Sequence, residues 1–401
     1  MTLVSVEEVE AARARLLDVL QPTPIERSRA IGELAGAEVL LKCENLQRTG
    51  SFKIRGAYNH LARLDHAERS RGVVCASAGN HAQGVALAAA LQGIPATVFM
   101  PVEAPLPKVQ ATEAYGAEVR LVGEDVSATL EAAIAVAEQE GRIFVHPFDH
   151  HDVIAGQGTL ALELLEQVPE PGTVLVPMGG GGLVSGMAAT LRARSPGTRI
   201  VGVQAAGAAA FAPSLAAGSA RELPTVDTIA DGIAVKRPGD LTLAHVRDLV
   251  DEVVTVDDEL LARAVVVLLE RAKLVVEPAG AAGVAAAMGH RTALDGPVVP
   301  VLSGGNIDPL VLQHLVTSGL TSEGRYATLR TQVPDEPGEL VRLLRIVADA
   351  RVNVVGVSHH RLGRLRLGQV AVVLELEARG HDHVADLRAT LEQEGYPIRT
   401  V

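Results

Sequence analysis

Residues 173–186 read TVLVPMGGGGLVSG, in which a short apolar strand, Thr173–Pro177, is followed almost directly by the four glycines Gly179–Gly182. Successive glycines raise the backbone entropy that is lost on folding, so such a run requires a structural reason. Close approach of backbone N–H groups to a phosphate supplies one, and a merely flexible loop is the alternative. Because the run matches neither GxxxxGKS nor an opening GxGxxG, it favours a compact phosphate group over a nucleotide.

The alternation that begins here extends in both directions, from Val39 to about Val301. Short β-branched runs alternate with alanine-rich helical segments such as His81–Gln92 and Asp125–Gln139. This alternation predicts a doubly wound α/β architecture with open, twisted sheets in two subdomains. The predicted strands are Gly72–Ala76, Ala96–Met100, Glu118–Leu121, Thr173–Pro177, Ile200–Gln204 and Pro297–Leu302.

The composition changes at Thr321–Tyr326, where the polar stretch TSEGRY predicts a linker over residues 321–325. Residues 326–401 then predict a second domain with the order βαββαβ, the ferredoxin-like plan. The first domain would be residues 1–320, with a smaller subdomain at about 48–150 inserted in it. The elements predicted after the linker are the strand Ala327–Val333, the helix Gly338–Ala350, the strands Val352–His360 and Gln369–Glu377, the helix His381–Gln393 and a short final strand.

Composition narrows the classes of partner. The chain has 401 residues, 48% hydrophobic and 21% charged, with a net charge of −12, which is typical of a folded acidic protein of two or three domains. An acidic chain gains nothing from counterion release, so nucleic acid is excluded as a partner. No apolar run is long enough to span a bilayer and the N-terminus does not resemble a signal peptide. Cys43 and Cys75 lack zinc or disulfide spacing, so we expect two reduced thiols and a cytoplasmic location.

The segment ENLQRTGSFKIRGA, Glu44 to Ala57, carries a candidate nucleophile. Thr49 or Ser51 can cap a helix that begins near Phe52, which places Lys53 in the first turn. The positive helix N-terminus disfavours a charged lysine and would lower its pKa, which suits an amine that condenses with an aldehyde. A solvated surface lysine is the alternative.

Two further turns follow predicted strands. SAGNHAQG, Ser77 to Gly84, opens a helix with free backbone N–H groups that favour a carboxylate or phosphate, to which Asn80 and His81 add side-chain donors. A helix start capped by Asn80 is the alternative.

LSGGN, Leu302 to Asn306, places Ser303 at the carboxyl edge of the sheet, where open α/β sheets bind ligands. Ser-Gly-Gly alone is a common turn, but all four segments converge on one cleft.

With these four segments in this order and spacing, the chain from about Pro22 to Asp308 resembles the fold-type II pyridoxal-phosphate (PLP) enzymes, whose fold is tryptophan synthase beta-like. The resemblance is strongest to the threonine ammonia-lyase (threonine dehydratase) and serine racemase branch. It implies that Lys53 binds PLP covalently and acts as the catalytic residue. It also implies that Phe52 packs on the cofactor ring, Asn80 bonds its 3′-hydroxyl and Ser303 meets its pyridine nitrogen. Further residues implied at the cofactor are Gly179, Gly180, Gly181, Gly182 and Leu183 at the phosphate, and Gly232 and Glu277 at the other ring edge.

The same resemblance implies that the turn Ser77, Ala78, Asn80 and His81 binds the substrate carboxylate. Relatives that racemise serine carry a second serine where this chain has Ala78, which cannot move a proton, so elimination is favoured over racemisation. Those relatives also carry acidic divalent-cation ligands after the strand that ends at Gln204. Here the segment reads QAAGAAA, so we predict no metal site.

The expected reaction is therefore conversion of L-threonine to 2-oxobutanoate and ammonia, with L-serine giving pyruvate more slowly. It would serve either isoleucine biosynthesis or threonine catabolism. Serine dehydratase, hydroxyaspartate ammonia-lyase and serine racemase are the alternatives within the family, and a non-catalytic amino-acid sensor is the alternative outside it.

The C-terminal region resembles ACT domains, since VPDEPGEL, Val333 to Leu340, matches their strand–turn–helix start. This implies a homo-oligomer, a dimer or tetramer, with allosteric control by an amino acid such as isoleucine or valine. A dimerisation module without a ligand is the alternative.

Overall fold

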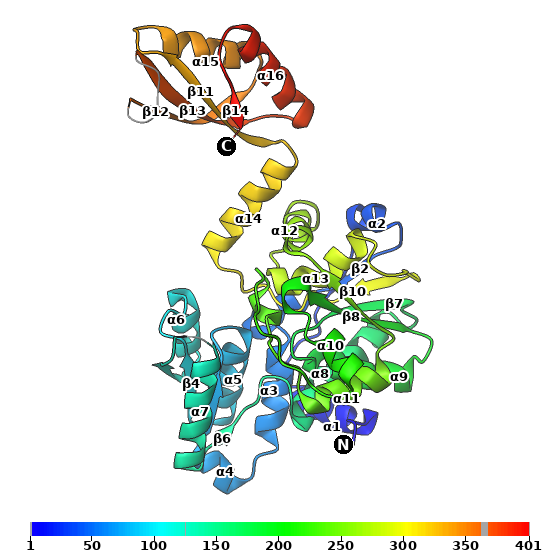
Figure 1. Ribbon diagram of the computed structural model, residues 1–401. Coiled ribbons are helices and arrows are strands. Elements are labelled where there is room, and N and C mark those ends of the chain that lie inside the picture. Colours follow the sequence, from blue (N-terminus) through cyan, green and yellow to red (C-terminus); the bar gives the residue numbers. More distant parts are fainter. Residues whose placement is uncertain (1, 125, 362–367, 401) are drawn as a thin grey trace. The chain divides into compact units, whose positions relative to one another are not determined.

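The computed structural model describes residues 2–124, 126–361 and 368–400, coloured along the chain in Figure 1. The chain divides into two compact units, Met1–Pro309 and Leu310–Val401. Among the described residues, no helix combines the length and the apolar character needed to cross a membrane.

The first unit is built on two four-stranded parallel sheets, as the alternating pattern predicts. One has the strand order β5-β4-β3-β6 and the other β10-β7-β8-β9. Every residue of β4 and β7 is buried, which is typical of parallel strands covered by helices on both faces. The strands are β3 (Val73–Ala76), β4 (Ala96–Met100), β5 (Glu118–Leu121), β6 (Ile143–Phe144), β7 (Thr173–Pro177), β8 (Arg199–Ala205), β9 (Glu252–Val256) and β10 (Val298–Pro300).

A short antiparallel pair, β1 (Ile25–Arg27) and β2 (Leu40–Lys42), joins the second sheet through bridges from Val39 to Val298 and from Lys42 to Val301. The helices of this unit are α1 (Val6–Leu16), α2 (Arg29–Ala35), α3 (Lys53–Ala62), α4 (His66–Arg71), α5 (Asn80–Gln92), α6 (Leu106–Ala114), α7 (Val126–Glu140), α8 (His151–Gln167), α9 (Gly182–Arg194), α10 (Phe211–Ala217), α11 (Asp240–Leu249), α12 (Asp258–Val267) and α13 (Pro278–Met288). Short 3-10 turns lie at Glu44–Leu46, Arg48–Gly50, Ala206–Ala208 and Asp231–Ile233, and a π-helical turn at Leu268–Ala272.

Glycines let the central helices pack with their backbones in contact. A Cβ on Gly156 of α8 would lie 2.6 Å from the Cα of Gly56 on α3, and one on Gly84 of α5 would lie 3.1 Å from the carbonyl carbon of Lys53. A Cβ on Gly186 of α9 would lie 2.5 Å from the nitrogen of Gly158 on α8. The last glycine of three of the four motifs therefore serves helix packing, and this packing brings the N-termini of α3, α5 and α9 toward one region.

The second unit contains the βαββαβ order in one antiparallel sheet, β12-β13-β11-β14. Its elements are β11 (Tyr326–Pro334), α15 (Glu339–Asp349), β12 (Asn353–His360), β13 (Gln369–Glu377), α16 (His381–Gln393) and β14 (Arg399–Thr400). Leu329, Leu343, Val372 and Leu387 belong to a buried core of its own, separate from the cores of the first unit.

The clearest departure from the predicted boundaries is at the linker, while the ends of other elements shift by one or two residues. The predicted linker 321–325 begins inside a helix, α14 (Pro309–Ser322), so the connection is largely helical and the compact units separate after Pro309. Leu, Val and His residues at helical spacing before Thr321 indicate this helix. The polar stretch TSEGRY at its end favoured a linker instead. The helix predicted from Asp125 begins at Val126 in the described residues, and Asp125 itself lies outside them.

Candidate active site

Lys53 is the first residue of α3 and its side chain points into protein surroundings. Its Nζ donates a hydrogen bond to the carbonyl oxygen of Pro147 at 3.0 Å and lies 5.2 Å from the centre of the Phe52 ring. Burial lowers the pKa of Lys53 to about 8, although the nearby charge of Glu277 acts in the opposite direction. A larger fraction of this amine is therefore neutral near pH 7 than for an ordinary lysine, and a neutral amine is the nucleophilic and basic form.

The cap predicted for α3 is wrong. Phe52 occupies the N-cap position without a side-chain cap, and the hydroxyls of Thr49 and Ser51 have no hydrogen-bond partner among the described residues. Thr49 has a positive φ of 64°, which turns the chain before the helix. What fixes this start is instead a pairing with the LSGGN turn, because Ser51 forms an antiparallel bridge with Gly304.

That pairing places Ser303 beside the start of α3. The N–H of Phe52 donates to the carbonyl of Ser303 at 3.2 Å. Ser303 is only 4% exposed, and its hydroxyl makes no hydrogen bond within the described part of the chain. Its Oγ is not among the buried unpaired polar atoms, so this hydroxyl reaches accessible space and is available to a ligand.

Asn80, at the start of α5, links the SAGN turn to two other elements. Its amide donates to Glu277 Oε1 at 2.6 Å, and its Oδ1 accepts from Asn306 at 2.7 Å. Asn306 also donates to the carbonyl of Thr49 at 2.7 Å. The next N-terminal residue, Gly79, occupies the N-cap position, so Asn80 is not the cap that the alternative reading of this turn required.

Glu277 is buried next to this pair, with 4% of its surface exposed. Burial, together with the charge of Asp231, raises its pKa to about 7, although the hydrogen bond from Asn80 acts to lower it. A Cβ on Gly232 would lie 3.3 Å from Glu277 Oε1, so the ADGI segment packs directly against this carboxyl. Glu277 is thus a proton-sharing group beside Lys53 rather than a permanently charged one.

The raised pKa of Glu277 predicts that ionisation of this carboxyl lowers the free energy of unfolding. In the cofactor-free protein, ionising Glu277 costs stability between its ordinary pKa of 4.5 and the folded value of about 7. Glu277→Gln should therefore gain stability relative to the unsubstituted chain as pH rises through this window, by about 1.4 kcal/mol for each pKa unit. Urea unfolding at pH 5 and pH 8 measures this, with the exposed Glu131→Gln as control. A difference that is independent of pH would contradict the assignment.

In the described residues, two structural features explain why the run Gly179–Gly182 requires glycine. Gly181 caps α9 with a φ of 94°, a conformation that side chains disfavour. Close neighbours also exclude side chains: a Cβ on Gly179 would lie 2.8 Å from the Cα of Ile233, and one on Gly182 would lie 2.9 Å from the Cβ of Phe148. Close packing therefore demands glycine here in addition to any ligand, a reason that the sequence did not reveal.

The same loop presents a row of free donors. The N–H groups from Gly179 to Val184 have no hydrogen-bond partner within the described ranges, and the first intrahelical bond there is from Ser185 to Gly181. Unpaired N–H groups at the positive end of a helix form an anion-binding site. The loop is therefore built to hold a phosphate or a carboxylate.

The SAGN turn offers a second, smaller row of donors. Ser77 Oγ accepts from the N–H of Gly79 at 3.1 Å, and the N–H groups of Asn80, His81 and Ala82 have no partner among the described residues. The side chain of His81 does not join them as expected. Its Nε2 donates to the carbonyl of Val145 at 2.9 Å, and burial, with the charge of Lys53, lowers its pKa to about 3. The backbone of His81, rather than its ring, remains available, beside the partly exposed methyl group of Ala78.

Residues 146–149, HPFD, complete the site and were missed in the sequence. Pro147 supplies the carbonyl that holds Lys53, and Phe148 packs against Gly180 and Gly182, so this segment connects the lysine to the glycine loop. The only signal available was a polar cluster directly after the short strand Ile143–Phe144.

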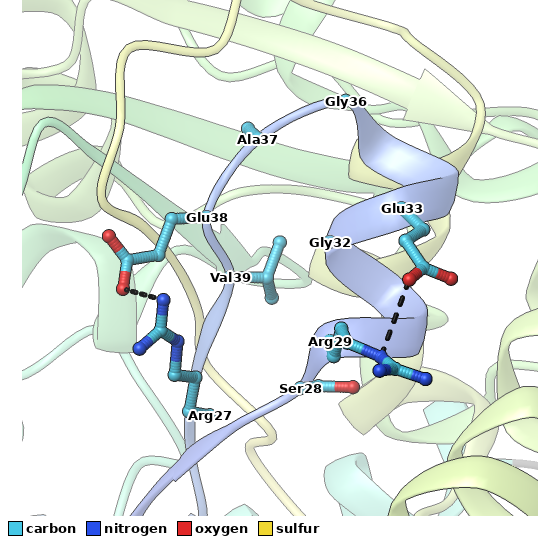
Figure 2. Close-up of a pocket in the computed structure, with 9 residues that line it drawn as sticks. All are labelled: Arg27, Ser28, Arg29, Gly32, Glu33, Gly36, Ala37, Glu38 and Val39. Atoms are coloured by element: carbon cyan, nitrogen blue, oxygen red, sulfur yellow. Dashed lines mark ion pairs between the residues drawn. The ribbon is translucent and has the colours of Figure 1, made fainter.

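A separate cavity of about 470 Å³ lies between β1 and α2 and contains none of the residues of this site. Its charged side chains are paired, Arg27 with Glu38 and Arg29 with Glu33 (Figure 2).

Residues 16–304 match the sequence profile of a family described as pyridoxal-phosphate dependent enzyme. The chain belongs to this PLP-dependent enzyme family. It is 45% identical over 400 residues to an L-threonine ammonia-lyase from Thermotoga maritima, with 100% of both chains covered. The solved structure of a threonine deaminase isoform from Solanum lycopersicum is similar with a TM-score of 0.74 and 33% identity, covering 78% of this chain and 89% of that one. Maize serine racemase is similar with a TM-score of 0.74 and 39% identity, covering 80% of this chain and 99% of that one.

The residues of this PLP-dependent enzyme fit the cofactor. Lys53 is a lysine of lowered pKa that can bind an aldehyde covalently, and the unpaired N–H groups of the glycine loop suit a phosphate dianion. The unpartnered hydroxyl of Ser303 suits a ring nitrogen, which needs a single hydrogen bond.

Proposed function

We propose that this enzyme is an ammonia-lyase that converts L-threonine into 2-oxobutanoate and ammonia and L-serine, more slowly, into pyruvate. The observation that carries the proposal is a partly neutral Lys53 amine, held by the Pro147 carbonyl, in a unit that also presents two rows of free backbone N–H groups. One row suits the cofactor phosphate and the other the substrate carboxylate. The names of the full-length relative and of the tomato structure support the same reaction.

We assign the cofactor contacts residue by residue. Lys53 binds PLP, Phe52 packs on its ring, and Asn80 bonds its 3′-hydroxyl. Ser303 bonds its ring nitrogen. The remaining contacts are Gly179, Gly180, Gly181, Gly182 and Leu183 at the phosphate, and Gly232 and Glu277 at the far edge of the ring. The hydrogen bond from Asn80 to Glu277 supports this, since it holds two of the assigned residues next to each other.

The substrate carboxylate is assigned to the turn Ser77, Ala78, Asn80 and His81. The N–H groups of Asn80 and His81 lie at the positive end of α5, a helix of 13 residues, which favours an anion. Ser77 holds the turn through its bond to Gly79. Because the His81 ring is bonded to Val145, the assignment for His81 is to its backbone.

The cofactor, when bound, accepts electron density from the substrate Cα and so makes the Cα proton acidic. Lys53, whose pKa is lowered to about 8, removes that proton as a neutral base. Glu277 and Asn80 keep a polar, proton-sharing environment at this edge of the site. Ala78 offers no acid or base on the opposite face, so protonation there, which racemisation requires, lacks a group to perform it.

A steady-state comparison of the two substrates tests this assignment. We expect kcat/KM for threonine to exceed that for serine by about 10- to 200-fold, since one methyl group contributes that much discrimination in a fitted pocket. Assays of 2-oxobutanoate and pyruvate measure both reactions, and chiral analysis of residual serine serves as the control for racemisation. Preferred formation of pyruvate, or accumulation of D-serine, would favour the serine dehydratase or serine racemase alternatives instead.

We propose further that residues 326–401, joined through 321–325 to the catalytic region 1–320, form an ACT domain that senses an amino acid. A cavity of about 280 Å³ is lined by the turn Pro334–Gly338, by His359 and by Arg361. Asp335 and Arg361 pair with each other at 3.1 Å, and they would exchange this pairing for the ammonium and carboxylate groups of a bound amino acid. The exposed valines Val355 and Val357 on the edge strand β12 support a homo-oligomer.

Isoleucine or valine should change the affinity for threonine by roughly 5- to 150-fold, the usual range of allosteric coupling. Arg361→Met should remove the response and leave the basal kinetics unchanged. The exposed Arg345→Met on α15 is the matched control. Threonine saturation curves with and without each effector measure this, and sedimentation measures the oligomer in parallel. Kinetics that neither amino acid alters would leave the domain as a dimerisation module.

We also place the enzyme in the cytoplasm. The two buried free thiols, Cys43 and Cys75, support this location.

A further inference from the structure

Two histidines and an aspartate from distant parts of the chain meet about two helical turns from Lys53 along α3. His60 lies on α3, His150 caps α8, and Asp152 lies in the first turn of α8. One potential ligand atom from each lies within 4.8 Å of the other two. The Nδ1 atoms of His60 and His150 are 3.3 and 4.0 Å from Asp152 Oδ2.

These spacings are near those of a metal site. A tetrahedral ion with bonds of about 2.0–2.1 Å separates its ligand atoms by roughly 3.3 Å. The two imidazole rings are already stacked close, with centres 4.1 Å apart and planes tilted by 56°. Small side-chain rotations would therefore bring three ligand atoms to one ion without moving the helices.

Hydrogen bonding within the protein accounts for only part of the cluster. Asp152 binds His60 Nδ1, and the N–H of Asp152 donates to His150 Nδ1 at 3.2 Å. The other nitrogen of His60, Nε2, is buried without any hydrogen-bond partner among the described residues, although His60 is only 5% exposed. A buried, unpaired imidazole nitrogen requires an explanation, and a bound ion that reorients the ring provides one.

The surroundings resemble the outer shell of metal sites. Arg63 Nε holds the other carboxylate oxygen, Oδ1, at 3.1 Å, which leaves Oδ2 directed at the histidines. Asn59 donates to the backbone carbonyl of Asp152 at 2.7 Å and fixes this turn. Such second contacts orient ligands before an ion binds. The side chain of His150 is 38% exposed, so an ion can enter from solvent.

We propose that His60, His150 and Asp152 bind a divalent first-row transition metal ion of the zinc class. Two imidazoles and one carboxylate suit such ions better than calcium or magnesium, which prefer oxygen ligands alone. Three protein ligands leave a fourth position to water, so the ion is exchangeable and accessory to the fold. The site ties α3, which begins at Lys53, to the segment that carries Pro147. It is distinct from the divalent-cation site that the sequence lacks after Gln204.

Equilibrium dialysis of the cofactor-loaded protein against Zn²⁺ tests the proposal. We expect one Zn²⁺ per chain, and at least tenfold weaker binding in His60→Asn and in His150→Asn. Asparagine at position 60 retains a donor for Asp152, and asparagine at position 150 is a favoured N-cap, so both variants should fold. His66→Asn, at an exposed histidine of α4, should bind like the unsubstituted chain.

Two further readouts exclude a general effect on folding. Zn²⁺ should raise the Tm of the unsubstituted chain and of His66→Asn but of neither ligand variant, since an ion stabilises only the state that binds it. Co²⁺ should give visible absorption bands of tetrahedral coordination that both ligand variants lack. Equal Zn²⁺ binding by all four proteins, or no shift in Tm with the unsubstituted chain, would overturn the proposal.

Discussion

Replacing Lys53 with alanine is expected to abolish turnover and covalent cofactor binding together. The amine is both the group that we assign to the aldehyde and the base at the substrate Cα, and among the described residues no other lysine is bonded to Pro147. Loss of a general base alone reduces kcat by about 10²- to 10⁴-fold, and loss of the covalent attachment adds to this. Threonine turnover and the visible absorbance of the protein-bound cofactor measure the two effects.

The matched variants separate chemistry from charge. Lys53→Arg retains the positive charge and the approximate size of the side chain but cannot form the covalent bond, so it should be as inactive as Lys53→Ala. Lys236→Ala removes an exposed lysine and should retain both activity and colour. A Lys53→Ala protein that keeps either turnover or the absorbance of a covalently bound cofactor would refute the assignment of this residue.

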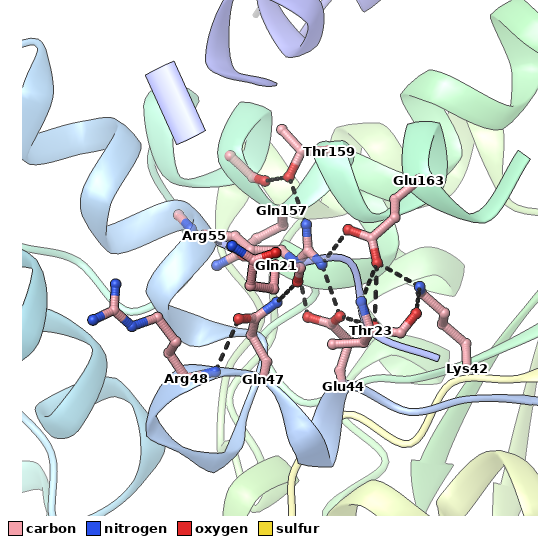
Figure 3. A network of polar contacts seen from close by, with 12 residues as sticks. Gln21, Thr23, Lys42, Glu44, Gln47, Arg48, Arg55, Gln157, Thr159 and Glu163 are labelled. Atoms are coloured by element: carbon pink, nitrogen blue, oxygen red, sulfur yellow. Dashed lines mark hydrogen bonds and ion pairs between the residues drawn. The ribbon is translucent and has the colours of Figure 1, made fainter. Parts of the chain in front are cut away.

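Arg55→Met should produce the largest loss of stability. Arg55 lies two residues after Lys53 and is the centre of a buried charge network (Figure 3). It binds both oxygens of Glu44, at 2.7 and 2.8 Å, and one oxygen of Glu163 at 2.7 Å. Lys42 holds the other oxygen of Glu163 at 2.5 Å, so two cations balance two carboxylates.

Every member of this network is removed from solvent, with side-chain exposures of 0% for Lys42 and Glu44, 3% for Arg55 and 11% for Glu163. Removing one cation leaves a buried carboxylate uncompensated, which costs about 3–5 kcal/mol. The effect on the site should follow, because the network anchors α3 to α8. Urea unfolding of the cofactor-loaded protein measures the loss.

Two comparisons make this prediction specific. Arg48→Met changes an exposed arginine of the same segment and should shift the free energy of unfolding by less than about 0.5 kcal/mol. The double variant Arg55→Met, Glu44→Met removes a whole ion pair, and should recover part of the loss because the remaining charges, Lys42 and Glu163, still balance. Equal losses in Arg55→Met and Arg48→Met would show that the network contributes little.

The network also predicts a pH dependence. Burial acts to raise the pKa of Glu163, but the charges of Arg55 and Lys42 outweigh it and lower the pKa below its ordinary 4.5. A lowered carboxyl pKa contributes stability above the unfolded pKa, which is lost as pH falls through the folded pKa. The difference between the unsubstituted chain and Arg55→Met should therefore be largest near neutral pH and shrink below 4.5.

Most strands could be located from the sequence because a strand buried in a parallel sheet is a local apolar run. The fully buried runs Ala96–Met100 and Thr173–Pro177 coincide with β4 and β7. Glu118–Leu121 also coincides with its strand, β5, although this edge strand is not buried. Boundaries failed where local signals were ambiguous, as at α14, whose polar end resembled a linker. The cap of α3 failed for a different reason, since a strand-like pairing with Gly304 replaced the local side-chain cap.

The sequence by itself determined the chemistry of this protein: a lysine, a glycine run, an asparagine turn and a serine turn, each directly before or after a short apolar segment. Those signals are local sequence patterns, so they can be recognised without knowing the tertiary contacts. Only the tertiary structure decided what each group does. It turned the His81 ring to Val145, raised the pKa of Glu277, and joined His60 to His150 and Asp152. These outcomes depend on burial and on pairs far apart along the chain, and neither leaves a spacing pattern that a single sequence can reveal.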